Sequence, residues 1–147
     1  MDLESMYQEI ILDHYRHPLH RGLQENFAAA AHHVNPTCGD EVTLRLSLHG
    51  EVIETVTWDG VGCSISQAST SIMSDLMTGR AIGDCLLLGE EFLHLLQSKG
   101  ATEPDEERLG DAVAFVGVSK YPARVKCALL GWMAFKDALA QAVAADE

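Results

Sequence analysis

Alternating hydrophobic and polar residues mark two neighbouring strands in the first half of the chain. In residues 41–49 apolar side chains occupy every second position, at Val42, Leu44, Leu46 and Leu48. Residues 52–58 alternate in the same way after a tight turn. Period-two patterns are typical of half-buried strands, so the pair predicts an antiparallel hairpin. The residues just before Asn35 are a candidate third strand, and residues 18–33 are otherwise expected to be irregular.

Apolar residues at three- and four-residue intervals predict helices in the rest of the chain. The first covers residues 2–17, where Pro18 ends the pattern. Beyond residue 63 the predicted elements are helices over 64–77, 84–98 and 122–143, a surface loop over 102–107 and a short helical piece over 109–118. Because the two clear strands precede most of the helices, the order predicts an α+β fold with helices packed on one face of a small antiparallel sheet.

Length, composition and charge indicate a single globular domain and argue against several kinds of partner. A chain of 147 residues with 47% apolar residues fits one globular domain, so residues 1–147 are expected to form a single domain. No stretch is long and apolar enough to span a membrane, and the acidic N-terminus lacks a secretory signal, which favours the cytoplasm. Ten basic and 22 acidic residues give a formal charge of −12 without a basic cluster, which argues against nucleic acid and anionic membranes as partners.

The chain has four cysteines and no C-x-x-C pair. In a reducing compartment such cysteines indicate metal or sulfur chemistry rather than a disulfide framework. Cys38 lies in the turn-forming segment Asn35–Asp40, with the carboxylate of Asp40 two residues further on. Thiolates and carboxylates bind zinc or iron, and a thiolate can also accept sulfur. The alternative at this position is an incidental exposed cysteine.

Two further cysteines lie in settings that favour reactive thiols. Cys63 follows a glycine-rich turn at the start of a helix, where N–H groups and the helix dipole stabilise a thiolate. Cys127 lies early in the last helix near Arg124 and Lys126, whose positive charges lower a thiol pKa. The alternatives are a buried cysteine in a capping turn and a core cysteine, respectively. Cys85, which precedes three leucines, is interpreted as a core residue. The histidines share no face of one element and are interpreted as surface or satisfied core residues.

Several segments in order resemble the IscU/SufU family of iron–sulfur cluster assembly proteins, the NifU N-terminal type. The matching segments are Tyr7–Tyr15, Asn35–Asp40, Gly60–Ser66 with Ala68-Ser69, and Pro122–Cys127. The resemblance extends over nearly the whole chain. It implies a SufE/NifU-like fold, a small antiparallel three-stranded sheet with helices packed on it, in agreement with the pattern above.

Two departures from the housekeeping scaffolds of this family resemble its SufU branch. The scaffolds carry a histidine immediately before the third cysteine, where this chain has Lys126. The stretch between Cys63 and Cys127 is also longer and includes the loop around residues 100–110. In addition, the segment Pro18–Gly22 replaces the family's usual Pro-Arg-Asn run. The SufU branch holds zinc and receives persulfide sulfur from a cysteine desulfurase.

The resemblance also implies a set of site residues. Carried over by position, the zinc ligands are Cys38, Asp40, Cys63 and Cys127. Cys38 is then the sulfur acceptor, and Arg124 is a nearby cation that steadies the anionic site or contacts a partner. The implied partner is a SufS-like cysteine desulfurase, with downstream cluster-assembly proteins as further candidates.

Three functions remain open at this point. In the first, the protein is a zinc-dependent sulfurtransferase partner whose Cys38 attacks the persulfide of the desulfurase. In the second, it is a non-catalytic scaffold that binds iron and assembles a [2Fe–2S] cluster on the same cysteines. Lys126 favours the first, because lysine substitutes poorly for a histidine ligand. In the third, the protein is a purely structural zinc domain, which the carboxylate on a loop tip disfavours.

Overall fold

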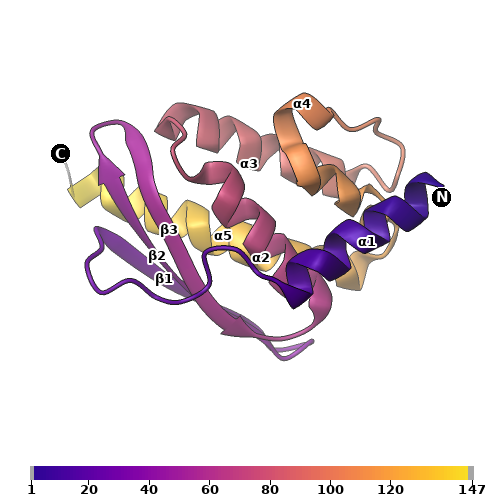
Figure 1. Ribbon diagram of the computed structural model, residues 1–147, viewed down its shortest axis with the longest axis horizontal. Coiled ribbons are helices and arrows are strands. Elements are labelled where there is room, and N and C mark those ends of the chain that lie inside the picture. The colour runs from indigo at the N-terminus through magenta and orange to yellow at the C-terminus, as the bar shows by residue number, and fades with distance from the viewer. Residues whose placement is uncertain (1, 146–147) are drawn as a thin grey trace.

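The computed structural model describes residues 2–145, which form an antiparallel sheet with helices packed against it (Figure 1). The strands are β1 (Ala29–Asn35), β2 (Asp40–His49) and β3 (Val52–Val61), in the spatial order β1-β2-β3. The predicted α+β fold with a three-stranded sheet is confirmed. The prediction that residues 18–33 are irregular is wrong from Ala29 onward, where the run of alanines pairs with β2.

The helices follow the predicted order with small shifts of their ends. They are α1 (Leu3–Arg16), α2 (Ser64–Met77), α3 (Ile82–Gln97), α4 (Glu106–Leu109) and α5 (Pro122–Ala145), with the 3-10 helices η1 (Gly110–Val116) and η2 (Val118–Lys120) between α4 and α5. The predicted loop over 102–107 ends two residues early. Its last residues join α4 because the Asp105 side chain accepts hydrogen bonds from the N–H groups of Glu107 and Arg108.

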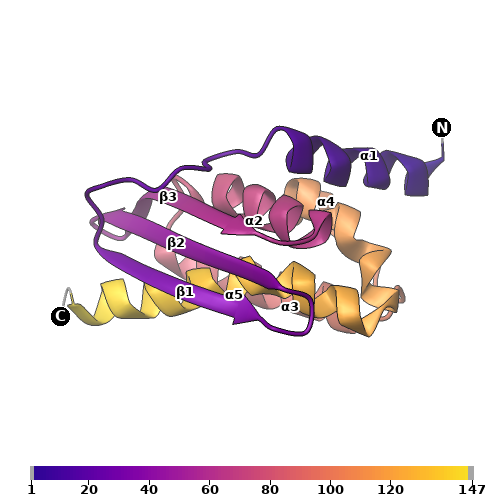
Figure 2. The same ribbon diagram turned by 90° about the horizontal axis from the view of Figure 1, so that it is seen from below.

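One face of the sheet packs on α2 and α5, as the alternation in β2 predicts. Leu44 and Leu46 of β2 are completely buried, and Trp58 of β3 is 1% exposed. Figure 2 shows the three strands side by side with α5 running along β1. The helix α3 packs on α5, η1 and η2, so it lies beyond the helices that cover the sheet. No helix within residues 2–145 is long and apolar enough to cross a membrane.

Close packing between α2 and α5 brings the candidate cysteines of these helices to the same end of the molecule. A Cβ atom at Gly131 of α5 would overlap the Thr70 side chain of α2, so glycine lets the two helices approach. The Ser69 hydroxyl donates a 2.6 Å hydrogen bond to the Ala128 carbonyl, and Trp132 Nε1 donates to the Ser69 oxygen at 2.9 Å. These bonds hold α2 beside the residue that follows Cys127.

The helix α1 is attached to the helical layer through a buried histidine. The two ring nitrogens of His14 lie 2.9 Å from Ser71 Oγ and 2.9 Å from Asp111 Oδ2. Ser71 Oγ also accepts a hydrogen bond from the Leu19 N–H. His14 is thus a satisfied core residue, as the sequence indicated, and it connects α1, α2 and η1.

Candidate metal centre

Cys38 lies at the exposed tip of the β1–β2 hairpin. Asn35 and Asp40 pair across the hairpin, and the Cys38 N–H donates a 3.2 Å hydrogen bond to the Asn35 carbonyl. Gly39 adopts a φ of +70°, a left-handed conformation that closes the turn. The structure therefore confirms the predicted position of this thiol at a loop tip, where another molecule can reach it.

Asp40 is the completely buried residue that joins the hairpin to the start of α2. Its Oδ1 accepts a 2.9 Å hydrogen bond from the Cys63 N–H, and its Oδ2 lies 3.9 Å from Cys63 Sγ. Cys63 occupies the N-cap position of α2 and is partly exposed. The carboxylate thus lies between the helix N-terminus and the hairpin, where the positive end of the helix dipole stabilises its charge.

Gly62 allows the close approach between the start of α2 and the Asp40 side chain. Its φ is +148°, and a Cβ atom at this position would overlap Asp40 Oδ1. We expect Gly62→Ala to lower the free energy of unfolding by about 1–3 kcal/mol, the range for a strained backbone position. Because the strain displaces Asp40, the variant should also bind a metal ion at this cluster more weakly. Chemical denaturation and metal analysis measure the two effects.

Gly83→Ala is the matched control, because a Cβ at residue 83 meets no atom within 4 Å and its backbone lies in α3. Unchanged stability and metal binding in Gly62→Ala would show that Asp40 does not depend on this contact.

Cys127 completes the cluster from the interior. It is 4% exposed on α5, and its Sγ lies 3.3 Å from Cys38 Sγ. The ligand atoms of Cys38, Asp40 and Cys127 all lie within 4.8 Å of one another. Cys63 joins this group through its contact with Asp40. The structure thus brings together all four side chains that the sequence singled out, from the hairpin tip, β2, the start of α2 and α5.

Burial decides the protonation of Cys127 in the metal-free protein. It raises the pKa of the Cys127 thiol well above its ordinary value, and hydrogen bonds with Asp40, Cys38 and Cys63 raise it further. The expectation that Arg124 and Lys126 lower this pKa is wrong, because both cations are exposed while the thiol is inside. Without another cation in the site, Cys127 is therefore a thiol, and a bound metal ion would displace its proton.

Asn35 contacts the cluster, whereas Arg124 lies one turn before Cys127 and contacts Tyr121. Arg124 is exposed on α5, and its guanidinium carbon lies 4.7 Å from the centroid of the Tyr121 ring, a cation–π contact. Asn35, which sequence reasoning treated only as a turn former, directs its side-chain Nδ2 toward Cys127 Sγ at 4.0 Å. Asn35 is 9% exposed. The one available signal for placing Asn35 at the site was its position opposite Asp40 in the hairpin. A residue that faces a candidate ligand across a hairpin also lies at the site.

The remaining cysteine and the other histidines lie outside this cluster. Cys85 is 1% exposed in α3, and burial raises its pKa to about 11, so it is a core thiol as the sequence indicated. His20, His32 and His33 each bind a carboxylate elsewhere, at Asp75, Glu41 and Asp137, respectively.

Comparison with known proteins identifies the family. The NifU-like N terminal domain family matches residues 6–128, a range that contains all four clustered side chains. The chain belongs to the family of NifU-like N-terminal domains. It is an iron–sulfur cluster assembly protein of the IscU/SufU family, so the resemblance seen in the sequence motifs is confirmed.

Individual relatives of this NifU-like chain include both kinds of family member. It is 39% identical to the zinc-dependent sulfurtransferase SufU of Bacillus subtilis, over 95% of this chain and 93% of that protein. It is 36% identical to the iron–sulfur cluster assembly scaffold protein IscU of Streptococcus pyogenes, over 93% of this chain and 84% of that protein. The crystal structure of a NifU-like N-terminal protein from Brucella abortus, 24% identical, has the same fold, with a TM-score of 0.85 over 95% and 96% of the two chains.

The chemistry of the cluster in this NifU-like protein is that of a metal site. Three thiols and a carboxylate are a donor set for tetrahedral Zn²⁺, and thiolates also bind iron. A completely buried carboxylate beside two thiols is costly without a cation to compensate its charge. The residues present therefore fit a divalent metal ion.

Proposed function

We propose that this protein is a zinc-dependent sulfur acceptor that takes persulfide sulfur from a cysteine desulfurase. The observation that carries the proposal is the contact between an exposed thiol, Cys38, and a buried thiol and carboxylate, Cys127 and Asp40. An exposed thiol can meet a partner's persulfide, and the buried groups behind it can hold a cation. Similarity to the zinc-dependent sulfurtransferase SufU of Bacillus subtilis supports the same function.

Zinc would be held by Cys38, Asp40, Cys63 and Cys127. Bound Zn²⁺ keeps cysteine sulfurs anionic at neutral pH, which the high pKa of Cys127 otherwise prevents. The N–H group of Cys63 orients the Asp40 carboxylate, and the Asn35 amide donates toward Cys127 Sγ. Such outer contacts fix the positions of the ligand atoms.

Of the four proposed ligands, only the exposed Cys38 takes part directly in sulfur transfer. The Cys38 thiolate attacks the terminal sulfur of the desulfurase persulfide, a new S–S bond forms at Cys38, and the old S–S bond breaks. The desulfurase cysteine leaves as a thiolate, so no external oxidant or reductant is required. Because Cys38 lies on a hairpin tip, it can move toward the partner while Asp40 and Cys127 stay in the buried part of the site. Arg124, exposed one turn before Cys127, is a candidate contact for the partner.

The alternative is a scaffold on which a [2Fe–2S] cluster is assembled and delivered. The similarity to IscU of Streptococcus pyogenes favours it. Lys126 opposes it, because an ammonium group has no lone pair for a metal and replaces the histidine of the housekeeping scaffolds. The exposed position of the Lys126 residue on α5 is compatible with a surface cation rather than a ligand.

Metal and acid-labile sulfide content decide between the two functions. Protein purified without air should contain one zinc per chain and almost no sulfide. After anaerobic reconstitution with iron and sulfide, we expect a cluster at low occupancy that is lost quickly in air, because Asp40 offers oxygen where imidazole is absent. A stable, stoichiometric cluster that passes intact to an apo-acceptor would contradict the proposal and support the scaffold. Lys126→His, which restores the histidine, is the matched variant and should hold the cluster longer.

A further inference from the structure

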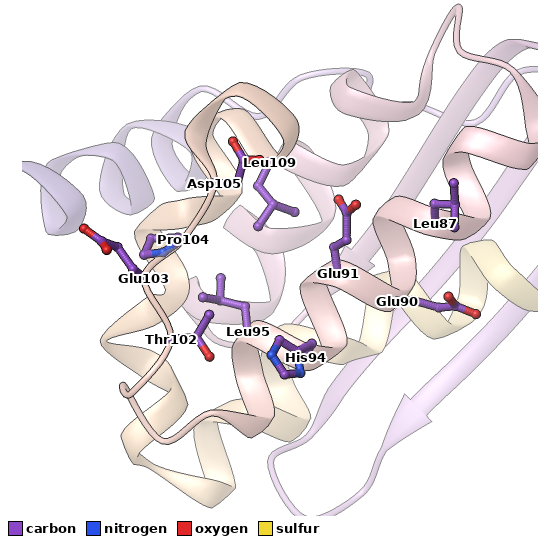
Figure 3. Close-up of a pocket in the computed structure, with 10 residues that line it drawn as sticks. All are labelled: Leu87, Glu90, Glu91, His94, Leu95, Thr102, Glu103, Pro104, Asp105 and Leu109. Carbon is purple, nitrogen blue, oxygen red and sulfur yellow. The ribbon is translucent and has the colours of Figure 1, made fainter.

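A groove lies between α3 and the segment over residues 102–105, away from the cysteine cluster. Its volume is about 390 Å³, within the range of ligand and peptide sites. Figure 3 shows Leu95 and Leu109 in the space between the two elements. Both are buried in the core, whereas Leu87, which also lines the groove, is 55% exposed. The groove thus has an apolar floor that continues into an exposed apolar side chain.

The rim of this groove is acidic. Glu90, Glu103 and Asp105 line it and are exposed, and Figure 3 shows Glu90 and Glu103 at opposite ends. Glu106 and Glu107 follow directly and are also exposed. Carboxylates at both ends of an apolar groove favour a ligand with cations on either side of an apolar group.

Arg108 does not neutralise Glu90 or Glu103, because it pairs with Asp84 and with Glu91, a further carboxylate that lines the groove. Arg108 Nη2 lies 2.8 Å from Asp84 Oδ1, and Arg108 Nε lies 3.2 Å from Glu91 Oε2. Asp84 also binds Arg80 Nη1, at 2.6 Å. The two guanidinium groups hold the pKa of the Asp84 carboxyl below its ordinary value. This network attaches α4 to α3, so both walls of the groove are positioned before any ligand binds.

We infer that this groove is a docking site for a basic segment of a partner protein, one that places an apolar side chain between lysine or arginine residues. The apolar side chain would cover Leu87 and the floor, and the flanking cations would meet Glu90 and Glu103. This inference goes beyond the proposed sulfur chemistry, since none of the four clustered side chains lines the groove.

A second copy of the chain is a poor occupant of the groove. In a symmetric contact the same patch lies on both partners, so the two acidic rims would face each other. The formal charge of −12 on each copy adds to the repulsion. Charge complementarity therefore favours a basic partner.

The test uses the full zinc-loaded chain, labelled with ¹⁵N, and a blocked 15-residue peptide with leucines and lysines at helical spacing. Amide shifts should change at the groove, and binding should weaken with added salt. Leu87→Ser/Glu90→Lys should reduce the affinity at least tenfold. The matched control is Leu86→Ser/Glu51→Lys, which makes the same chemical changes at exposed residues outside the groove and should stay within twofold.

Several outcomes would overturn the inference. These are equal weakening in both double variants, shifts spread over other acidic surfaces, equal binding of a scrambled peptide of the same composition, and no binding at millimolar peptide. Self-association that Leu87→Ser abolishes would also overturn it, in favour of a contact between copies. The amide spectrum shows whether Leu87→Ser/Glu90→Lys folds. If it does not fold, Glu103→Lys alone is tested in its place. Zinc content and sulfur acceptance should be unchanged in all groove variants, so failure here leaves the proposed function untouched.

Discussion

Replacing Cys38 by serine should abolish sulfur acceptance from a cysteine desulfurase and leave the fold intact. A serine hydroxyl is far less acidic than a thiol, so it provides no anion to attack a persulfide at neutral pH. We expect at least about a 100-fold loss of stimulated desulfurase turnover, since removal of a nucleophile typically exceeds the roughly 10²- to 10⁴-fold effect of a single proton-transfer group. The exposed hairpin tip contributes little to the core, so secondary structure should be unchanged.

Mass spectrometry after incubation with desulfurase and cysteine provides the direct measurement. In the native chain, added sulfur should be found on the peptide that contains Cys38. Cys85→Ser makes the same chemical change at a buried core thiol and should leave this modification in place. If Cys38→Ser stimulated the desulfurase as well as the native protein does, a different group would have to accept the sulfur.

At the proposed zinc site, replacing Cys63 by serine should abolish stoichiometric zinc binding. We expect zinc affinity to fall by more than about 100-fold, because removing a ligand exceeds the roughly 10- to 100-fold effect of outer-shell changes. At constant free zinc, a 100-fold weaker site lowers the free energy of unfolding by up to about 2.7 kcal/mol. For a chain of this length the corresponding fall in Tm is about 8 °C.

Competition with a chromophoric chelator and thermal unfolding measure these effects. Metal-free native protein should unfold at nearly the same temperature as metal-free Cys63→Ser, because the difference arises from bound zinc. Cys85→Ser should keep its zinc. Full zinc retention in Cys63→Ser would remove Cys63 from the ligand set and leave the trio of Cys38, Asp40 and Cys127 that lie within 4.8 Å of one another.

Because the pKa of the Cys127 thiol is high, both zinc affinity and stability should depend on pH. A group that is protonated in the metal-free site must release its proton when a cation binds, so zinc affinity should rise with pH. In the metal-free protein, the free energy of unfolding changes with pH in the opposite direction. The folded state holds the protons of Cys85 and Cys127 more tightly than the unfolded state, so the free energy of unfolding falls as pH rises above about 9.

Local patterns in the sequence determined most of the fold and singled out the four side chains that cluster in the structure. Alternation in β2 and β3 and helical periodicity after residue 63 report which side of each element is buried, and that depends mainly on nearby residues. Turn residues around Cys38 and the helix start at Cys63 likewise are local signals. The first strand was only a candidate, because Ala29–Ala31 has no alternation and becomes a strand through its pairing with β2.

Only the tertiary structure decided the electrostatics and the contacts between distant segments. Asn35 meets Cys127 across 92 positions of the chain, so no spacing rule could reveal that contact. The pKa of Cys127 followed from burial between elements rather than from its charged neighbours in sequence. The acidic run after residue 102 indicated a solvated loop, yet its packing against α3 forms one wall of an apolar groove. Burial and proximity are properties of the assembled chain, because they depend on which surfaces exclude water together, and sequence periodicity specifies the surfaces but not their partners.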